Sequence, residues 1–317
     1  MLYATLRVAL LGLSVIVLRL LPWPVLLLIL LGFLVPLALL TNRTHRTRIA
    51  GARVLVTGAS SGLGRQLALQ AAARGAEQVI LVSRGAERLQ AVADEIGPRA
   101  LVRPCDITDP AAVQALADGL AADGIVPDIV VNNAGAGAWQ HIEEGSLQDL
   151  TDQMACPYLG AAWLTRALAP AMLARGSGHV LNVTSLASLG GFRAAVGYGT
   201  ARWAVRGFSQ NLRADLHDAG IGVTLLNAAE IGDTAYFAAD NAGAASHARI
   251  PWLFQLPLVR LLSKDSARTA SEGLDGIESG THEVLSPWYM AAPTKLMVDV
   301  FPELFHALLR QGESGRR

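Results

Sequence analysis

The sequence predicts an α/β domain in which a parallel sheet carries helices on both faces, preceded by an N-terminal transmembrane segment. Three observations lead to this prediction. Short apolar runs alternate with helical patterns from residue 53 onward, glycine-rich turns follow two of these runs, and an uncharged apolar run occupies residues 20–40. Strands that alternate with helices in this way form parallel sheets joined by right-handed crossovers.

The composition agrees with this division. Of the 317 residues, 52% are hydrophobic and only 16% are charged, which indicates a membrane-embedded part. The formal net charge is zero, so nothing predicts nucleic-acid binding. Two cysteines, Cys105 and Cys156, favour a reducing compartment over a disulfide framework. Cys105 and the histidines His141, His179 and His217 lack the spacing of metal ligands, so no metal is expected.

Residues 1–42 form the predicted membrane anchor. The apolar run at 20–40 is long enough to span a bilayer as a helix, and the PWP sequence at 22–24 interrupts its path from an earlier apolar stretch. One span and a shallow hairpin are both compatible with this pattern, and a buried core helix is a third alternative. The arginine-rich linker at 43–52 predicts that the following domain lies on the cytoplasmic side.

The first strand and helix of the domain meet at a glycine-rich turn. The strand at 53–57 leads into TGASSGLG, after which a helical pattern begins near Leu63. Glycines in such a turn let the backbone approach a pyrophosphate, whose charge then lies over the helix N-terminus. The residues expected to bind the cofactor here are Gly58, Ser60, Ser61, Gly62, Leu63 and Gly64. A plain strand-turn-helix without a ligand is the alternative.

The second strand, QVILVSR, ends in Ser83 and Arg84. An acidic residue at such a strand end would bind the two ribose hydroxyls of NAD, and this position has none. The guanidinium of Arg84 can instead pair with a 2′-phosphate, which favours NADPH. An exposed arginine that only opens the next helix is the alternative.

Two further strands follow, separated by helical patterns at 86–96 and 111–123. ALVRPCDIT carries Asp106, and DIVVNNAG ends in Asn133, Ala134 and Gly135. TGASSGLG and NNAG, in this order, resemble the short-chain dehydrogenase/reductase family over roughly residues 50–285. The resemblance implies a doubly wound, Rossmann-type sheet, an adenine contact at Asp106 and a cofactor contact along the NNAG turn.

The same resemblance implies a catalytic set. Ser185 ends the strand GHVLNVTS, and Tyr198 lies thirteen positions later, as in the family. There the serine binds the substrate oxygen, and the tyrosine gives or takes a proton. The family lysine four residues later binds the nicotinamide ribose and favours the phenolate. Here that position is Arg202, whose permanent charge supplies the electrostatic effect but which does not readily release a proton.

Two other positions depart from the family. Pro157 occupies the place of a catalytic asparagine; it either kinks the helix and frees the Gln153 carbonyl to hold a water, or marks lost function. Ala228 and Ala229 replace the Pro-Gly pair beside the nicotinamide. The residues expected near the cofactor beyond this pair are Ile231 and Thr234. Glu230 is either unusually near the expected nicotinamide or a solvated acid of the loop.

The expected reductase domain covers residues 53–285 and includes an apolar substrate lid at 235–262. An apolar lid on a membrane-anchored enzyme predicts a lipophilic carbonyl or alcohol substrate, such as a keto-sphingoid, steroid, retinoid or fatty acyl compound, with NADP(H) as the cofactor. A lid that only packs on the core is the alternative at that segment. A catalytically impaired NADP(H)-binding scaffold at the membrane is the alternative function.

Residues 286–317 are expected to form a C-terminal amphipathic segment, with an apolar helical stripe that Pro302 interrupts. The stripe is compatible with contact with a membrane beside the substrate entrance, with the core, or with a partner subunit. The family resemblance implies a homodimer or homotetramer.

Overall fold

The computed structural model describes residues 22, 24, 25, 27, 28, 32, 44–135, 137–229 and 265–310. The chain divides into two units, Met1–Arg43 and Thr44–Arg317. In the described ranges no helix combines the length and the apolar character that a membrane crossing requires. The predicted anchor at 1–42 lies almost wholly outside the described residues, and so does the predicted lid at 235–262.

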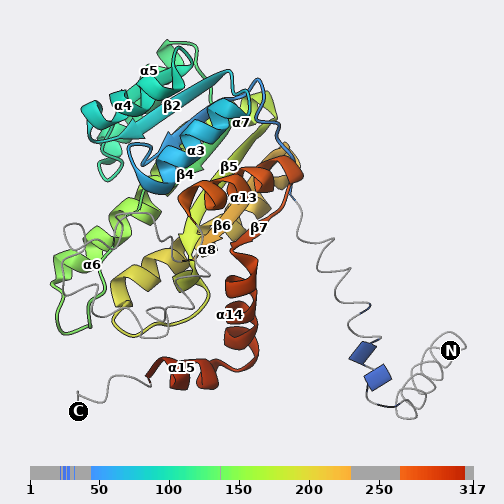
Figure 1. Cartoon of the computed structure of the whole chain (residues 1–317). Helices are drawn as coiled ribbons and strands as arrows, with labels where there is room; N and C mark the ends of the chain where they lie inside the picture. Colours follow the sequence, from blue (N-terminus) through green and yellow to red (C-terminus); the bar gives the residue numbers. More distant parts are fainter. Residues whose placement is uncertain are drawn as a thin grey trace, which may run out of the picture. The chain divides into compact units, whose positions relative to one another are not determined.

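Within the described part of the second unit, seven strands form one sheet in the order β3-β2-β1-β4-β5-β6-β7 (Figure 1). All neighbouring pairs are parallel, which confirms the predicted doubly wound sheet. The strands are β1 (Arg53–Thr57), β2 (Gln78–Ser83), β3 (Ala100–Pro104), β4 (Ile129–Asn132), β5 (Gly178–Ser185), β6 (Ile221–Ala228) and β7 (Glu283–Ser286).

Helices cover both faces of this sheet. The helices are α3 (Gly62–Ala73), α4 (Ala86–Ile96), α5 (Pro110–Ala122), α6 (Leu147–Met154), α7 (Gly160–Arg175), α8 (Val196–Leu216), α13 (Ser266–Ser279), α14 (Trp288–Val300) and α15 (Pro302–Arg310). Helices α3, α4 and α13 contribute to one buried core, and α5, α7 and α8 to the other. Figure 1 shows α6 and α14 beyond the sheet, near the carboxyl ends of its strands.

The strands are buried on both faces, which explains their nearly continuous apolar sequences. In β2, for example, Val79 and Leu81 enter one core, whereas Ile80 and Val82 enter the other. The helix predicted at 111–123 begins one residue earlier, at Pro110, because the Asp109 carboxylate accepts a hydrogen bond from the N–H of Ala111 and proline suits the first helical position.

Residues 44–52 form a strap that crosses the amino ends of the strands. The N–H of Thr44 donates to the carbonyl of Gly280 at 2.8 Å, that of Thr47 donates to the carbonyl of Ile277 at 3.3 Å, and Ile49 is fully buried. The segment predicted as a linker at 43–52 is therefore part of the folded unit from Thr44 onward. The unit begins nine residues before the predicted boundary at 53.

The strap also covers His179 of β5, whose ring lies 2.9 Å from Oγ1 of Thr224 and 3.3 Å from Oγ1 of Thr47. Burial, with a smaller effect of His45, lowers the pKa of His179 to about 3. The folded protein therefore keeps this imidazole neutral between pH 6.5 and about 3, while the unfolded chain takes up a proton in that range.

We expect the free energy of unfolding to fall as the pH drops from 6.5, by up to about 1.4 kcal/mol per pH unit from this group alone. His179→Gln removes the titrating ring and should flatten the dependence. Urea denaturation at pH 7.5, 6 and 5 measures both slopes; parallel slopes for the two proteins would contradict the assignment.

Candidate cofactor and catalytic site

The turn between β1 and α3 is shaped by its glycines. Gly58 and Gly62 have φ values of 67° and 51°, which side-chain-bearing residues rarely adopt. A Cβ atom at Gly64 would overlap the carbonyl oxygen of Gly58, and one at Gly58 would lie 2.9 Å from Nδ2 of Asn133. Ser61 is the N-cap residue of α3, and its side chain makes no capping bond in the described structure. Backbone N–H groups at this helix N-terminus are thus left for an anionic group.

Thr57, the last residue of β1, joins this turn to the one after β4. Its Oγ1 accepts the N–H groups of Asn133 and Ala134, each at 3.0 Å, and donates to the carbonyl of Val131. Nδ2 of Asn133 donates back to the carbonyl of Thr57 at 3.0 Å. The two glycine-rich turns therefore form one rigid edge. The sequence analysis did not single out Thr57, although a hydroxyl residue directly before the glycine turn was a visible signal.

The strand ends beyond β1 carry a second group of polar side chains. Oγ of Ser83 is buried, and the described residues offer it no hydrogen-bond partner. Arg84 is exposed beside it, and the carboxylate of Asp106 accepts two hydrogen bonds from Thr108 at 2.8 and 3.0 Å. Burial by itself would raise the pKa of Asp106, but the Thr108 hydrogen bonds and the nearby Arg84 charge hold it below its usual value. A buried hydroxyl beside an exposed guanidinium suits a phosphorylated ribose.

Tyr198 lies near the start of α8 and is only 4% exposed. Its ring packs against Gly137, where a Cβ atom would lie 2.5 Å from Cδ2 of the tyrosine, and its centroid is 5.8 Å from that of Trp139. Oγ1 of Thr184 donates to the carbonyl of Arg202 at 3.0 Å, which fastens α8 to the end of β5. Ser185 follows directly, so the structure places Ser185 and Tyr198 at the same edge of the sheet.

Arg202 lies one helical turn after Tyr198 and is 5% exposed. Its guanidinium carbon is 5.1 Å from the centroid of the Tyr198 ring. A Cβ atom at Gly135 would lie 2.7 Å from Nη2 of this guanidinium, so the cation fits between the NNAG turn and the tyrosine. A buried cation at this distance from a phenol ring stabilises added negative charge on the phenol.

A family model described as short chain dehydrogenase matches residues 52–244. The chain belongs to the short-chain dehydrogenase family.

Named relatives agree with this assignment. The chain is 35% identical over 184 residues to the NADP-dependent 3-hydroxy acid dehydrogenase YdfG of Salmonella typhi. This match covers 58% of this chain and 74% of that protein. It is 32% identical to an uncharacterized oxidoreductase of Myxococcus xanthus, over 81% of this chain and 96% of that one.

Solved structures share the fold. A short-chain dehydrogenase from Streptomyces avermitilis has a TM-score of 0.69 and 27% identity, covering 81% of this chain and 96% of that one. A short chain dehydrogenase from Burkholderia cenocepacia J2315, solved in complex with NADP, has a TM-score of 0.67 and 25% identity, covering 84% and 100%.

In this short-chain dehydrogenase, Pro157 lies within a π-helical turn, Ala155–Leu159, between α6 and α7. The N–H of Gly160 donates to the carbonyl of Ala155, and the wider turn accommodates a residue that has no N–H to donate. The nearby Gln153 acts through its side chain, since its Oε1 accepts the N–H of Ala138 at 3.2 Å. It therefore holds the segment that leads from the NNAG turn to Trp139.

A buried polar network, which the sequence analysis did not single out, supports the segment after Ser185. Arg206 binds Glu283 of β7 through two hydrogen bonds of 2.7 and 3.1 Å, and Nδ2 of Asn227 donates to the same carboxylate. Oδ1 of Asn227 accepts the hydroxyl of Ser188 at 2.9 Å. The network ties α8, β6 and β7 to the short 3₁₀ helix Leu186–Ser188 that follows Ser185.

The remaining predicted positions lie outside the described residues. These are Glu230, Ile231, Thr234 and the lid at 235–262. Ala228 and Ala229 are described and buried at the end of β6, beside the other strand ends. Among the residues that the structure describes, no group of three or more His, Cys, Asp or Glu side chains could hold a metal ion.

Proposed function

We propose that this protein is a membrane-anchored, NADP(H)-dependent oxidoreductase that reduces the carbonyl, or oxidises the alcohol, of a lipophilic substrate. The observation that carries the catalytic part is the buried pair of Tyr198 and Arg202 beside the NNAG turn. It combines a proton donor with a fixed positive charge at the edge where the sheet presents its glycine-rich turns.

The described residues fit NADP(H), which is the cofactor. Gly58 and Gly64 keep side chains out of the closely packed turn before α3. The buried hydroxyl of Ser83 and the carboxylate of Asp106 lie toward the adenosine end, and Arg84 provides a cation for the 2′-phosphate. When bound, the nicotinamide supplies or accepts the hydride.

The chain's own residues handle the proton. In the reductive direction, Tyr198 donates its hydroxyl proton to the substrate oxygen, and the hydroxyl of Ser185 donates a hydrogen bond to that oxygen. The phenolate that remains is stabilised by the guanidinium of Arg202 until a proton from water restores it. In the oxidative direction the same phenolate takes the alcohol proton.

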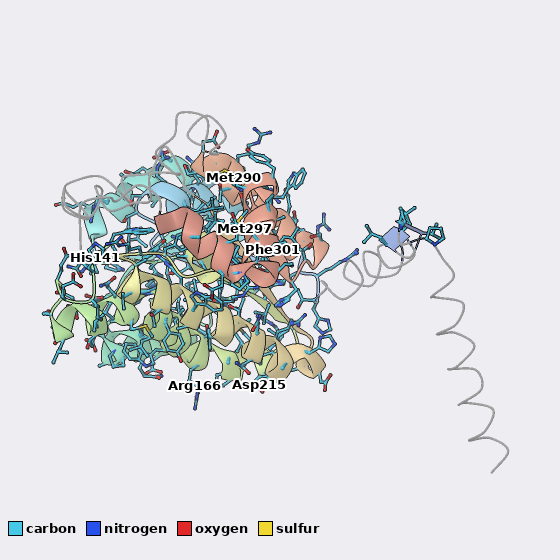
Figure 2. The ribbon with its side chains drawn as sticks, turned by 90° about the horizontal axis from the view of Figure 1, so that it is seen from below. His141, Arg166, Asp215, Met290, Met297 and Phe301 are labelled. Carbon is cyan, nitrogen blue, oxygen red and sulfur yellow. The ribbon has the colours of Figure 1, made fainter. Side chains whose placement is uncertain are left out.

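Arg84→Ala should remove most of the preference for NADPH over NADH. Loss of a charge-assisted arginine–phosphate pair should weaken NADPH binding about tenfold or more. NADH has no 2′-phosphate, so its affinity should not change. Titration of both cofactors by nucleotide fluorescence measures the two dissociation constants. Arg166→Ala is the matched control, because Arg166 is exposed on α7 and points away from the domain in Figure 2. Equal affinities of the unmutated protein for the two cofactors would contradict the role of Arg84.

The apolar surroundings of Tyr198 support a lipophilic substrate. Trp139, Ala187 and Ala195 pack around the tyrosine, with Phe192 against them. The YdfG relatives are named for 3-hydroxy acids, so a small hydroxy acid is the second candidate substrate class.

The proposed membrane association rests on the apolar run at 20–40 and on the C-terminal helices. Leu296, Val300, Phe301 and Leu304 are all more than half exposed, and Figure 2 shows Met290, Met297 and Phe301 along this C-terminal region. The arginines after the anchor favour a catalytic domain on the cytoplasmic side. Proteolysis of intact cells tests this placement: a domain digested from outside, without opening the membrane, would contradict it.

The decisive test of function is incubation of the detergent-solubilised protein with NADPH and a panel of carbonyl compounds, followed by product mass spectrometry. The panel contains lipid ketones and aldehydes in one arm and short 3-oxo acids in the other. Products from the lipid arm support the proposal, and products from the acid arm alone favour the second candidate. If neither arm gives a product and Tyr198→Phe retains every cellular effect, the cofactor-binding scaffold is favoured over the enzyme.

A further inference from the structure

The C-terminal helix α15 packs on the loop at 189–195, which precedes the catalytic tyrosine. Phe305 is 5% exposed, although its neighbours Leu304 and Phe301 are 52% and 58% exposed. Its ring lies edge-on to Phe192 with the centroids 5.5 Å apart. A Cβ atom at Gly190 would lie 2.8 Å from Cε1 of Phe305 and equally close to Cγ2 of Val298, so both C-terminal helices touch this loop.

The aromatic contacts continue from this loop to the catalytic residue. The ring of Phe192 lies 6.1 Å from Trp139 in an edge-to-face arrangement, and Trp139 lies 5.8 Å from Tyr198. Each pair lies within the distance range in which aromatic rings attract one another beyond simple burial. Within the described residues, the rings of Phe305, Phe192, Trp139 and Tyr198 therefore form a row that connects α15 to the catalytic tyrosine.

The conformation of this loop depends on the contacts that surround it. Ala194 adopts φ = 56°, a left-handed backbone conformation that persists in an alanine only where surrounding contacts impose it. Phe192, two residues earlier, packs against Trp139 on the inside and against Phe305 on the outside. Phe305→Ala would remove this outer ring contact and so weaken the packing of Phe192 on Trp139.

We propose that Phe305 is a specificity-determining residue of this enzyme. Through Phe192 and Trp139 it fixes an apolar wall beside Tyr198, and this wall binds the apolar group attached to the reacting carbon of the substrate. The inference rests on the proposed function in one respect, namely that the reacting carbon lies at Tyr198. It assigns the C-terminal helix a role in substrate selection that is separate from any contact with a membrane.

Two methyl ketones that differ in one apolar group test this role without a membrane: benzylacetone and 2-butanone. Phe305→Ala should raise KM for benzylacetone about tenfold and leave KM for 2-butanone and both kcat values within about twofold. Phe301→Ala removes the same kind of side chain from an exposed position and should change KM for neither ketone. Gly190→Val, which retains Phe305 but displaces it, should reproduce the loss for benzylacetone. An equal loss for both ketones would overturn the proposal, and so would unchanged selectivity in Phe305→Ala.

A binding measurement separates this inference from the proposed function. Calorimetric titration of the two ketones into the full-length protein saturated with NADP⁺ requires no turnover. If the carbonyl panel gives no product but benzylacetone binds more tightly than 2-butanone and Phe305→Ala removes the difference, the wall is supported and the proposed function fails. If the unmutated protein binds both ketones equally, the proposed wall is refuted, whether or not turnover occurs. Thermal unfolding of each variant identifies loss of folding. If Phe305→Ala does not fold, Phe305→Leu, which preserves much of the side-chain volume, provides the selectivity comparison.

Discussion

Tyr198→Phe is expected to lower turnover by about 10³-fold or more while leaving NADPH binding nearly unchanged. The substitution removes only the hydroxyl that donates the proton, and positioned acid–base catalysis accounts for rate effects of this order. The ring remains packed against Gly137 and Trp139, so the fold and the cofactor edge should persist. Steady-state turnover with the best substrate of the panel and fluorescence titration of NADPH measure the two quantities.

Tyr158→Phe is the matched control for this substitution. Tyr158 lies in the π-helical turn with its ring 6.1 Å from that of Phe208, and no step of the mechanism uses its hydroxyl. It should retain turnover within a few-fold. If Tyr198→Phe remains equally active, another group supplies the proton and the mechanism is wrong.

Arg202→Met is expected to lower turnover about a hundredfold or more. The guanidinium carbon lies 5.1 Å from the centroid of the Tyr198 ring, and the substitution removes this buried positive charge from beside the phenolate. Alcohol oxidation needs the phenolate, so the activity of the variant in that direction should move to higher pH. The pH profile of kcat therefore separates this electrostatic role from a general loss of structure, which would lower activity at every pH alike.

Arg202→Lys should be better tolerated than Arg202→Met, because it retains a positive charge at the position where the family uses lysine. Full activity is not expected, since the planar guanidinium fills the space beside Gly135 that a narrower ammonium leaves open. An Arg202→Met enzyme with unchanged turnover and pH profile would show that the cation has no part in the reaction.

Sequence patterns were sufficient to predict the features that depend on residues close together in the chain. The strands are buried on both faces and therefore appear as apolar runs, and β1 begins and ends at the predicted residues, 53 and 57. Gly58 and Gly64 stand where the backbone allows no side chain, so the turn could be recognised from letters alone. The cationic replacement at Arg202 was equally visible, since it depends on a spacing of one helical turn.

Other features depend on side chains that are far apart in the chain. Thr57 joins two glycine turns across 76 positions, and Arg206 meets Glu283 across 77. The arginine-rich residues 43–52 were expected to be a linker between the anchor and the domain, yet from Thr44 onward the backbone of this segment pairs with residues near 280. Such contacts leave no periodic signal in either partner.

By itself, the sequence determined the alternation of strands and helices, the place of the glycine-rich turns and the candidate reacting residues, because apolar alternation, glycine placement and helical spacing are properties of neighbouring residues. Only the tertiary structure decided that Arg202 lies between Gly135 and Tyr198, that Pro157 is accommodated in a π-helical turn, and that Phe305 reaches the active-site loop. The stripe that contains Phe305 was compatible with a membrane, a partner or the core. Close packing against Gly190 and Phe192 selects the core for Phe305, because a buried aromatic ring gains most where a matching surface excludes water from both of its faces.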